Sequence, residues 1–300
     1  STGLSTIEWV KTGAGDDWLI GSSVANRLEG GIGNDWLQGG QGNDTLVGGI
    51  GNDTADFSDA TAGVTVVLNG DAQGTATSSD TGSDLLYSIE NVLGSSYADN
   101  IKANDSNANW FDGGAGADTI LAGAGNDVVV FDAQDTSVDG GAGTDTLWIR
   151  DAAVNLASAS TSNWTGFEVL DMRGSNGTAL TLDLAATVHH MAASGSTVTV
   201  LADAQDVIDL AVMSSSAGAW SAGADVVSNG SIYHTWTSSG TVDTAASSMT
   251  VRVSSEATVR LVGTSGAETV LGTAGNDLMT GFGGNDSVFG GVGNDTLLSD

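Results

Sequence analysis

The sequence contains no cysteine and no proline, and only 7 of its 300 residues are lysine or arginine. Without cysteine the chain has no disulfide framework, no thiolate metal site and no thiol nucleophile. The shortage of cationic side chains argues against nucleic-acid binding, which depends on Lys and Arg at the phosphates, and against adsorption to an anionic bilayer. No apolar run approaches about 18 residues, so we expect no membrane-spanning segment.

Acidic side chains and glycine are abundant instead. The 37 Asp and Glu residues produce a formal net charge of −30, and there are 44 glycines. Hydrophobic residues make up 40% of the chain and include eight tryptophans. This apolar content predicts a packed core rather than disorder. Because the acidic groups far outnumber the cationic side chains, we expect metal cations to supply the missing positive charge.

Three stretches repeat with a period of nine residues, which is the signature of a repeat architecture. The first covers residues 12–56 and reads TGAGDDWLI, GSSVANRLE, GGIGNDWLQ, GGQGNDTLV and GGIGNDTAD. The second covers residues 104–148 and reads NDSNANWFD, GGAGADTIL, AGAGNDVVV, FDAQDTSVD and GGAGTDTLW, with a looser unit, GSSYADNIK, before it at 94–102. The third covers residues 263–298 and reads GTSGAETVL, GTAGNDLMT, GFGGNDSVF and GGVGNDTLL.

The nine positions of a unit have distinct roles. Glycines at positions one, two and four permit positive φ angles and predict a tight turn. The last three residues predict a very short strand with one apolar side chain, at position eight, facing inward. One unit buries too little to be stable alone, so the units must stack into a solenoid. If each unit makes half a circuit, Asp35 lies between Asp17 and Asp53 on one edge, and Asp44 lies on the other.

This stacking raises an electrostatic problem at position six. Neighbouring strands lie about 4.8 Å apart, and two carboxylates at that distance repel by roughly 3–4 kcal/mol at an effective dielectric constant of 20. A column of them would exceed the net stability of an ordinary domain, about 5–15 kcal/mol. We therefore expect a cation between successive turns. Carboxylate and carbonyl oxygens suit Ca²⁺ better than Mg²⁺, which requires a stricter octahedron.

The units resemble the GGxGxDxUx nonapeptide of the RTX (repeats-in-toxin) proteins, and GGIGNDWLQ and GGQGNDTLV match it at every defining position. The resemblance implies an all-β, parallel β-roll with Ca²⁺ bound between turns, and secretion by a bacterial type I system. It also implies that the position-six aspartates and the turn carbonyls are the metal ligands. The residues that match are Asp17, Gly31, Gly33, Asp35, Gly40, Gly42, Asp44, Gly49, Gly51, Asp53, Asp118, Asp127, Asp145, Asp277, Asp286 and Asp295. Units with Asn26, Asn109 or Thr136 at position six depart from the pattern, so sites there stay open.

Wider β inserts are expected to separate the three arrays. The predicted organisation is a first array over 1–56, a β insert over 57–93, a second array over 94–148, a β-rich spacer over 149–262 and a third array over 263–300. The insert resembles segments between RTX arrays of large secreted bacterial proteins, and we expect it to widen the coil with longer strands without breaking the stack. The spacer resembles a module of RTX adhesins and surface proteins, with one short helix predicted near 184–192.

No catalytic motif accompanies the repeats. The sequence has neither the HExxH of zinc proteases nor the GxSxG of a nucleophile elbow, and we expect no enzymatic activity. The leading interpretation is a calcium-dependent extracellular structural protein of a bacterial surface assembly, such as an adhesin stalk, a surface layer or a filament. It would fold on binding calcium after secretion.

Two other functions stay open. One is a calcium-binding accessory module of a secreted protease, lipase or epimerase. The other is a glycan-binding adhesin region, since Trp18 and Trp36 should lie over one another on the outer face, where they could stack on sugars, fill space or contact a neighbouring molecule. The last array reaches Asp300 without an evident polar cap. We therefore expect either a continuation of the chain or self-association end to end.

Overall fold

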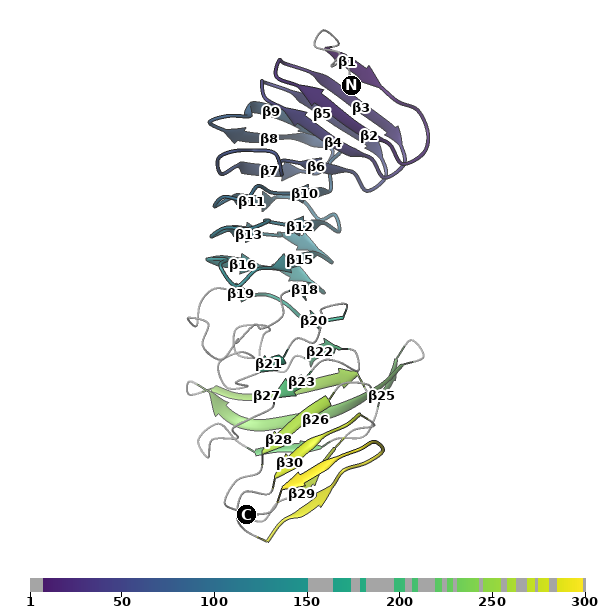
Figure 1. Cartoon of the computed structure of the whole chain (residues 1–300), viewed down its shortest axis with the longest axis vertical. Helices are drawn as coiled ribbons and strands as arrows, with labels where there is room; N and C mark the ends of the chain where they lie inside the picture. Colours follow the sequence, from purple (N-terminus) through teal and green to yellow (C-terminus); the bar gives the residue numbers. More distant parts are fainter. Residues whose placement is uncertain are drawn as a thin grey trace. The chain divides into compact units, whose positions relative to one another are not determined.

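The computed structural model describes residues 8–150, 164–173, 179–181, 197–202, 207–209, 219–222, 226–228, 231–242, 245–254, 258–262, 269–272, 275–280 and 285–298. Every regular element in these ranges is a β-strand (Figure 1), which confirms the predicted all-β class. The predicted helix near 184–192 lies outside them. The described residues include no helix that is long and apolar enough to cross a lipid bilayer. The chain divides into two compact units, Ser1–Leu147 (unit 1) and Trp148–Asp300 (unit 2).

The strands of unit 1 alternate between two sheets. In sheet order, the first sheet contains β1 (Trp9–Lys11), β3 (Arg27–Ile32), β5 (Thr45–Ile50), β9 (Gly82–Tyr87), β8 (Ala72–Ser78), β7 (Thr65–Asn69), β11 (Asn100–Ala103), β13 (Thr119–Leu121) and β16 (Ser137–Asp139). The second sheet contains β2 (Trp18–Ser22), β4 (Trp36–Gly40), β6 (Thr54–Asp56), β10 (Asn91–Leu93), β12 (Trp110–Asp112) and β15 (Val128–Phe131), and β18 (Thr146–Ile149) begins in this unit. Two-residue strands, β14 (Ala124–Gly125) and β17 (Ala142–Gly143), pair between turns.

The pairing is parallel, with a register of two repeat units. In the first sheet Trp9 pairs with Arg27 and Arg27 pairs with Thr45. In the second sheet Trp18 pairs with Trp36. Each nonapeptide therefore makes half a circuit, as its sequence predicts, and the structure is a parallel β-roll.

Position eight forms the core of unit 1. Leu28, Leu37 and Leu46 are at most 1% exposed. The other buried side chains at this position are Leu19, Ala55, Ile101, Phe111, Ile120, Val129, Val138 and Leu147. Each fully buried aliphatic side chain contributes about 1.5–3 kcal/mol. Because every unit adds only one such residue, stability accumulates by stacking.

The insert changes the first sheet more than the second. Strands β9, β8 and β7 form an antiparallel meander, joined in parallel to β5 on one side and to β11 on the other. The second sheet has only β10 over the same interval. The stack stays continuous through strands of five to seven residues, as predicted, but the antiparallel pairing was not predicted. Since stacked strands share one spacing, this unequal addition accounts for the inclination of β1, β3 and β5 against β11, β13 and β16 (Figure 1).

Unit 2 combines parallel stacking with a hairpin. One group of strands contains β20 (Val169–Asp171), β22 (Thr197–Leu201), β27 (Ala245–Ser254), β26 (Ser231–Val242), β24 (Ala219–Ala222) and β25 (Val226–Ser228). A second contains β21 (Ala179–Thr181), β23 (Val207–Asp209), β28 (Thr258–Val262), β30 (Leu278–Thr280) and β32 (Thr296–Leu298), and β29 (Thr269–Leu271) pairs with β31 (Ser287–Phe289). The long β26 and β27 pair in antiparallel fashion. The remaining strand of this unit is β19 (Trp164–Thr165).

Candidate calcium sites

Two kinds of turn recur before the strands. We call those with glycine at positions two and four and aspartate at position six the glycine turns. They are 12–17, 30–35, 39–44, 48–53, 113–118, 122–127, 140–145 and 290–295. The serine turns are 21–26 and 94–99, which share the pattern GSSxA followed by Asn or Asp.

Backbone carbonyls of the glycine turns point along the stack. All the glycines predicted to supply carbonyl ligands have positive φ, namely Gly31, Gly33, Gly40, Gly42, Gly49 and Gly51. A Cβ built on Gly49 would overlap the carbonyl oxygen of Gly31, and one on Gly51 would overlap that of Gly33. The carbonyl oxygens of one turn therefore face the next turn on the same edge, and only glycine leaves room for them.

The position-six aspartates point inward rather than into solvent. Asp35, Asp44 and Asp53 are at most 1% exposed. Their Oδ1 atom accepts the backbone N–H of the position-six residue in the stacked turn: Asp17 N lies 2.9 Å from Asp35 Oδ1, and Asp35 N lies 2.8 Å from Asp53 Oδ1. These donors offset part of the repulsion expected from bare carboxylates. These backbone donors were not predicted from the sequence.

The second carboxylate oxygen has no such donor. Oδ2 of Asp35, Asp44, Asp53, Asp118 and Asp127 is buried and has no hydrogen-bond partner. An uncompensated buried charge costs several kcal/mol. Built at Gly30, a Cβ would overlap Oδ2 of Asp35, so this oxygen lies against the turn backbone. An oxygen-binding cation at this position would remove the penalty.

The chemistry of the donors fits calcium. Within the described ranges, no three acidic or imidazole side chains converge to hold a metal ion. A cation in a glycine turn would therefore be held by one or two carboxylates together with turn carbonyls. Such flexible all-oxygen coordination is what Ca²⁺ accepts.

Burial also changes the protonation of these groups. Desolvation raises the pKa of Asp44, Asp53, Asp118 and Asp127 to about 6, against the opposing effect of the backbone N–H each accepts. A raised carboxyl pKa means that the folded chain disfavours the ionised form. At neutral pH the ionised aspartates therefore require positive charge from elsewhere.

The remaining predicted ligands lie in both units. Asp145 is buried, and its Oδ1 accepts the N–H of Asp127 at 2.8 Å. In unit 2, Asp277 is buried and its N–H donates to Oδ1 of Asp295 at 3.1 Å. Asp17, Asp286 and Asp295 are half-buried. The structure thus joins Asp17, Asp35 and Asp53 on one edge and places Asp44 in a separate column.

Three acidic residues extend the columns and were not among the predicted ligands. Oδ1 of Asp84 accepts the N–H of Asp44 at 2.8 Å, and Oε2 of Glu90 accepts the N–H of Asp53 at 2.9 Å. The N–H of Asp99 donates to Oδ1 of Asp118 at 2.8 Å. Asp99 was visible at position six of GSSYADNIK. Asp84 and Glu90 lie in the insert, where the nine-residue frame is lost, so no periodic signal points to them.

Position five carries a second ladder that the sequence analysis also missed. The side-chain oxygen of Asn34 accepts the N–H of Asn52 at 2.9 Å, and that of Asn126 accepts the N–H of Thr144 at 2.8 Å. The recurrence of asparagine just before the aspartate was the available signal. The ladder begins at Asp16, whose Oδ1 accepts the N–H of Asn34 at 2.7 Å, and otherwise links stacked turns through neutral amide side chains.

The serine turns satisfy position six with protein donors. The N–H of Ser22 donates to Oδ1 of Asn26 at 2.6 Å. In the other serine turn, Ser95 donates from its N–H to Oδ2 of Asp99 at 2.6 Å and from Oγ to Oδ1 at 2.8 Å. Val64 N–H adds a third donor, 2.6 Å from Oδ1. Both oxygens of Asp99 therefore have donors within the chain.

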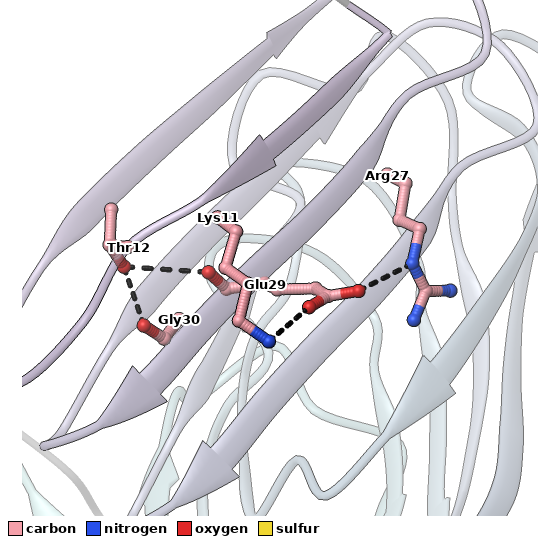
Figure 2. A network of polar contacts seen from close by, with 5 residues as sticks. All are labelled: Lys11, Thr12, Arg27, Glu29 and Gly30. Atoms are coloured by element: carbon pink, nitrogen blue, oxygen red, sulfur yellow. Dashed lines mark hydrogen bonds and ion pairs between the residues drawn. The ribbon is translucent and has the colours of Figure 1, made fainter.

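Two basic side chains of unit 1 form ion pairs with Glu29, away from the position-six aspartates. Figure 2 shows Glu29 on β3 between two of the few basic residues, with Lys11 Nζ 2.8 Å from Oε2 and Arg27 Nε 2.6 Å from Oε1. The hydrogen bond from Lys11 is the largest of the effects that lower the pKa of Glu29. The Thr12 hydroxyl donates to the carbonyl of Gly30 beside them. Lys11 and Arg27 are exposed whereas Glu29 is buried, so solvent screens these ion pairs only on the side of the basic groups.

These features define the class: a parallel β-roll whose turns present buried carboxylates and carbonyls suited to calcium. A comparison with protein families matches the RTX calcium-binding nonapeptide repeat (4 copies) at residues 2–23, 20–55, 93–129, 104–147 and 262–297. The chain is an RTX-type calcium-binding repeat protein. A search of curated proteins finds no significant match.

Proposed function

We propose that the chain is a calcium-dependent extracellular structural protein without catalytic activity, built to fold after secretion into a surface assembly such as an adhesin stalk, surface layer or filament. In a low-calcium cytosol the chain, with its net charge of −30, repels itself and stays unfolded. Outside the cell, calcium neutralises the aspartate columns and the roll forms. Extracellular calcium modules commonly bind in the 10⁻⁴–10⁻³ M range, which suits such a switch.

The observation that carries this proposal is the run of buried Oδ2 atoms without hydrogen-bond partners in Asp35, Asp44 and Asp53. They occupy successive glycine turns, so their desolvation penalties add. Ligand binding to the folded state alone stabilises it by RT ln(1 + [L]/Kd), about 2.7 kcal/mol per site at 100 times Kd. Several sites together account for a switch between unfolded and folded chain.

The test is a calcium titration of the full chain followed by circular dichroism, with reversal by EGTA. We expect little β signal in EGTA, a cooperative gain with calcium, and a weaker response to magnesium. A chain that is fully β-structured in EGTA at neutral pH would refute calcium-coupled folding. Light scattering of the folded chain tests the assembly, and a strictly monomeric chain in calcium would contradict self-association end to end.

A second candidate, glycan binding, rests on the outer face of the second sheet. The rings of Trp18 and Trp36 have centroids 6.0 Å apart and are tilted by 47°. Trp18 is 70% exposed, while the indole N–H of Trp36 donates to Asp56 Oδ2 at 2.7 Å. Aromatic faces beside polar groups can hold a saccharide. Screening on a glycan array in calcium, with W18A as the comparison, tests this function, and equal signals from both proteins would reject it.

A further inference from the structure

One turn of unit 1 has its carboxylate at position two and an amide at position six. The turn 104–109 reads NDSNAN, with Asp105 at position two, where glycine turns have glycine, and Asn109 at position six, where they have aspartate. Among the described residues other than glycine, only Ser88 has a positive φ. Asp105 therefore does not adopt the left-handed backbone that Gly31 and Gly49 adopt at this position.

The side chains at positions two and six of this turn each leave a buried oxygen unsatisfied. Asn109 is 3% exposed; its Nδ2 donates to the carbonyl of Glu90 at 2.7 Å, but its Oδ1 has no hydrogen-bond partner. Asp105 Oδ1 accepts the N–H of Asn107 at 2.9 Å, and its Oδ2 is buried without a partner. A desolvated oxygen without a donor is costly, so both atoms are suited to bind a cation.

The next turn on this edge, 122–127, contributes further oxygens. The N–H of Asn109 donates to Oδ1 of Asp127 at 2.8 Å, and Oδ2 of Asp127 is buried without a partner. A Cβ built on Gly125 would overlap the carbonyl oxygen of Asn107, so this carbonyl faces the turn above. The backbone N–H of Ala124 in this turn donates to the carbonyl of Asp105 at 3.3 Å, so the two turns are stacked directly on one another.

We propose that turns 104–109 and 122–127 form a calcium site in which Asp105 at position two replaces the usual position-six carboxylate. Its ligands are the carboxylates of Asp105 and Asp127, the amide oxygen of Asn109 and the carbonyl of Asn107. The set is all oxygen with two negative charges, which suits Ca²⁺ rather than a transition metal. The inference rests on calcium binding by the chain as a whole, and it assigns a site to a turn whose motif is degenerate.

The test counts calcium ions bound to the full-length chain, by equilibrium dialysis in calcium followed by metal analysis. We expect Asp105→Asn to bind one ion fewer than the wild type. The matched control, Asp59→Asn, removes the same charge from an exposed residue between β6 and β7 and should leave the count unchanged. An unchanged count in D105N would overturn the site.

A second variant keeps the test valid if D105N does not fold. Asn109→Asp restores a carboxylate at position six while Asp105 remains. If the site already exists, N109D binds calcium at least as tightly with the same number of ions. If it does not, N109D gains one ion and the inference is wrong. Failure of the wild type to bind any calcium would instead refute the proposed function.

Discussion

The glycine turns and the serine turns of unit 1 differ in what compensates the side chain at position six. In the glycine turn 48–53, Asp53 has one oxygen bonded to a backbone N–H and one buried oxygen without a partner. In the serine turn 94–99, Ser95 supplies an N–H and a hydroxyl to the corresponding Asp99. In the serine turn the protein itself supplies donors to both carboxylate oxygens, whereas the glycine turn leaves one buried oxygen for a cation to bind.

This difference implies that calcium dependence is uneven along the roll. Glycine at position two frees the turn to present carbonyl oxygens, while serine at that position uses its own donors to close the turn. Serine turn 21–26 lies between glycine turns, and serine turn 94–99 follows the insert. We therefore expect them to hold the polypeptide in register where no ion is bound.

The largest effect should be that of pH on the β-structure of the chain in the absence of calcium. Burial raises the pKa of Asp44, Asp53, Asp118 and Asp127 to about 6, from an unfolded value near 3.9. A raised carboxyl pKa stabilises the fold fully below the unfolded value, and this stabilisation is lost as pH rises through the folded value. In EGTA the β signal should thus be present at about pH 4 and fall towards pH 7. Circular dichroism across this range measures it, and a signal that rises with pH would contradict the assignment.

The next largest effect, on the free energy of unfolding, should come from replacing the position-two glycine of a glycine turn with serine. Gly49 has φ +125°, and a Cβ there would overlap the carbonyl of Gly31. Gly49→Ser should cost about 3 kcal/mol or more in urea unfolding with calcium. Gly13→Ser is the control at the same position of another turn, because nothing lies within 4 Å of its Cβ, and should change stability by about 0.5 kcal/mol or less. Equal effects would show that the carbonyl contacts do not matter.

A smaller effect on the free energy of unfolding should come from replacing the position-six residues Asp53 and Asp99. The two replacements should differ in how this effect depends on calcium. Asp53→Asn removes a ligand charge and should cost up to about 2.7 kcal/mol at calcium 100 times Kd. Asp99→Asn places an amide N–H against donors and should cost about 1–3 kcal/mol at every calcium concentration. Urea unfolding from 1 to 100 mM calcium distinguishes them. D53N should lower the slope of stability against log calcium, and D99N should not; a lowered slope in D99N would assign calcium to the serine turn.

The smallest effect should come from the serine hydroxyl. Ser95→Ala removes the donor to Asp99 Oδ1 and should cost about 1 kcal/mol, independently of calcium. Ser96→Ala changes the exposed neighbour in the same turn and should be neutral. Thermal unfolding of the variants in saturating calcium checks both. Loss of a bound ion in S95A would show that the hydroxyl supports a metal site instead.

The structure differs most from the sequence-based prediction in the insert, where the nine-residue period is lost. Within the frame, position eight predicts the buried column of Leu19, Leu28 and Leu37, and the spacing predicts a register of 18 residues. In the insert, Asp84 and Glu90 take over the role of position six without any periodic signal. The positions of Asp84 and Glu90 depend on how the antiparallel meander returns the polypeptide to the stack. The local sequence composition does not encode this path.

The sequence by itself determined the architecture, because a strict period of nine with one apolar residue per unit can bury that residue only by stacking half-circuits. It also determined the acidic, oxygen-rich character of the turns. Only the tertiary structure decided which carboxylate oxygens have donors. Asp53 and Asp99 occupy the same position of their units, yet one leaves Oδ2 without a partner and the other has both oxygens bonded. The reason is that these donors come from a neighbouring serine and from residues many positions away, such as Val64, and only folding brings them together.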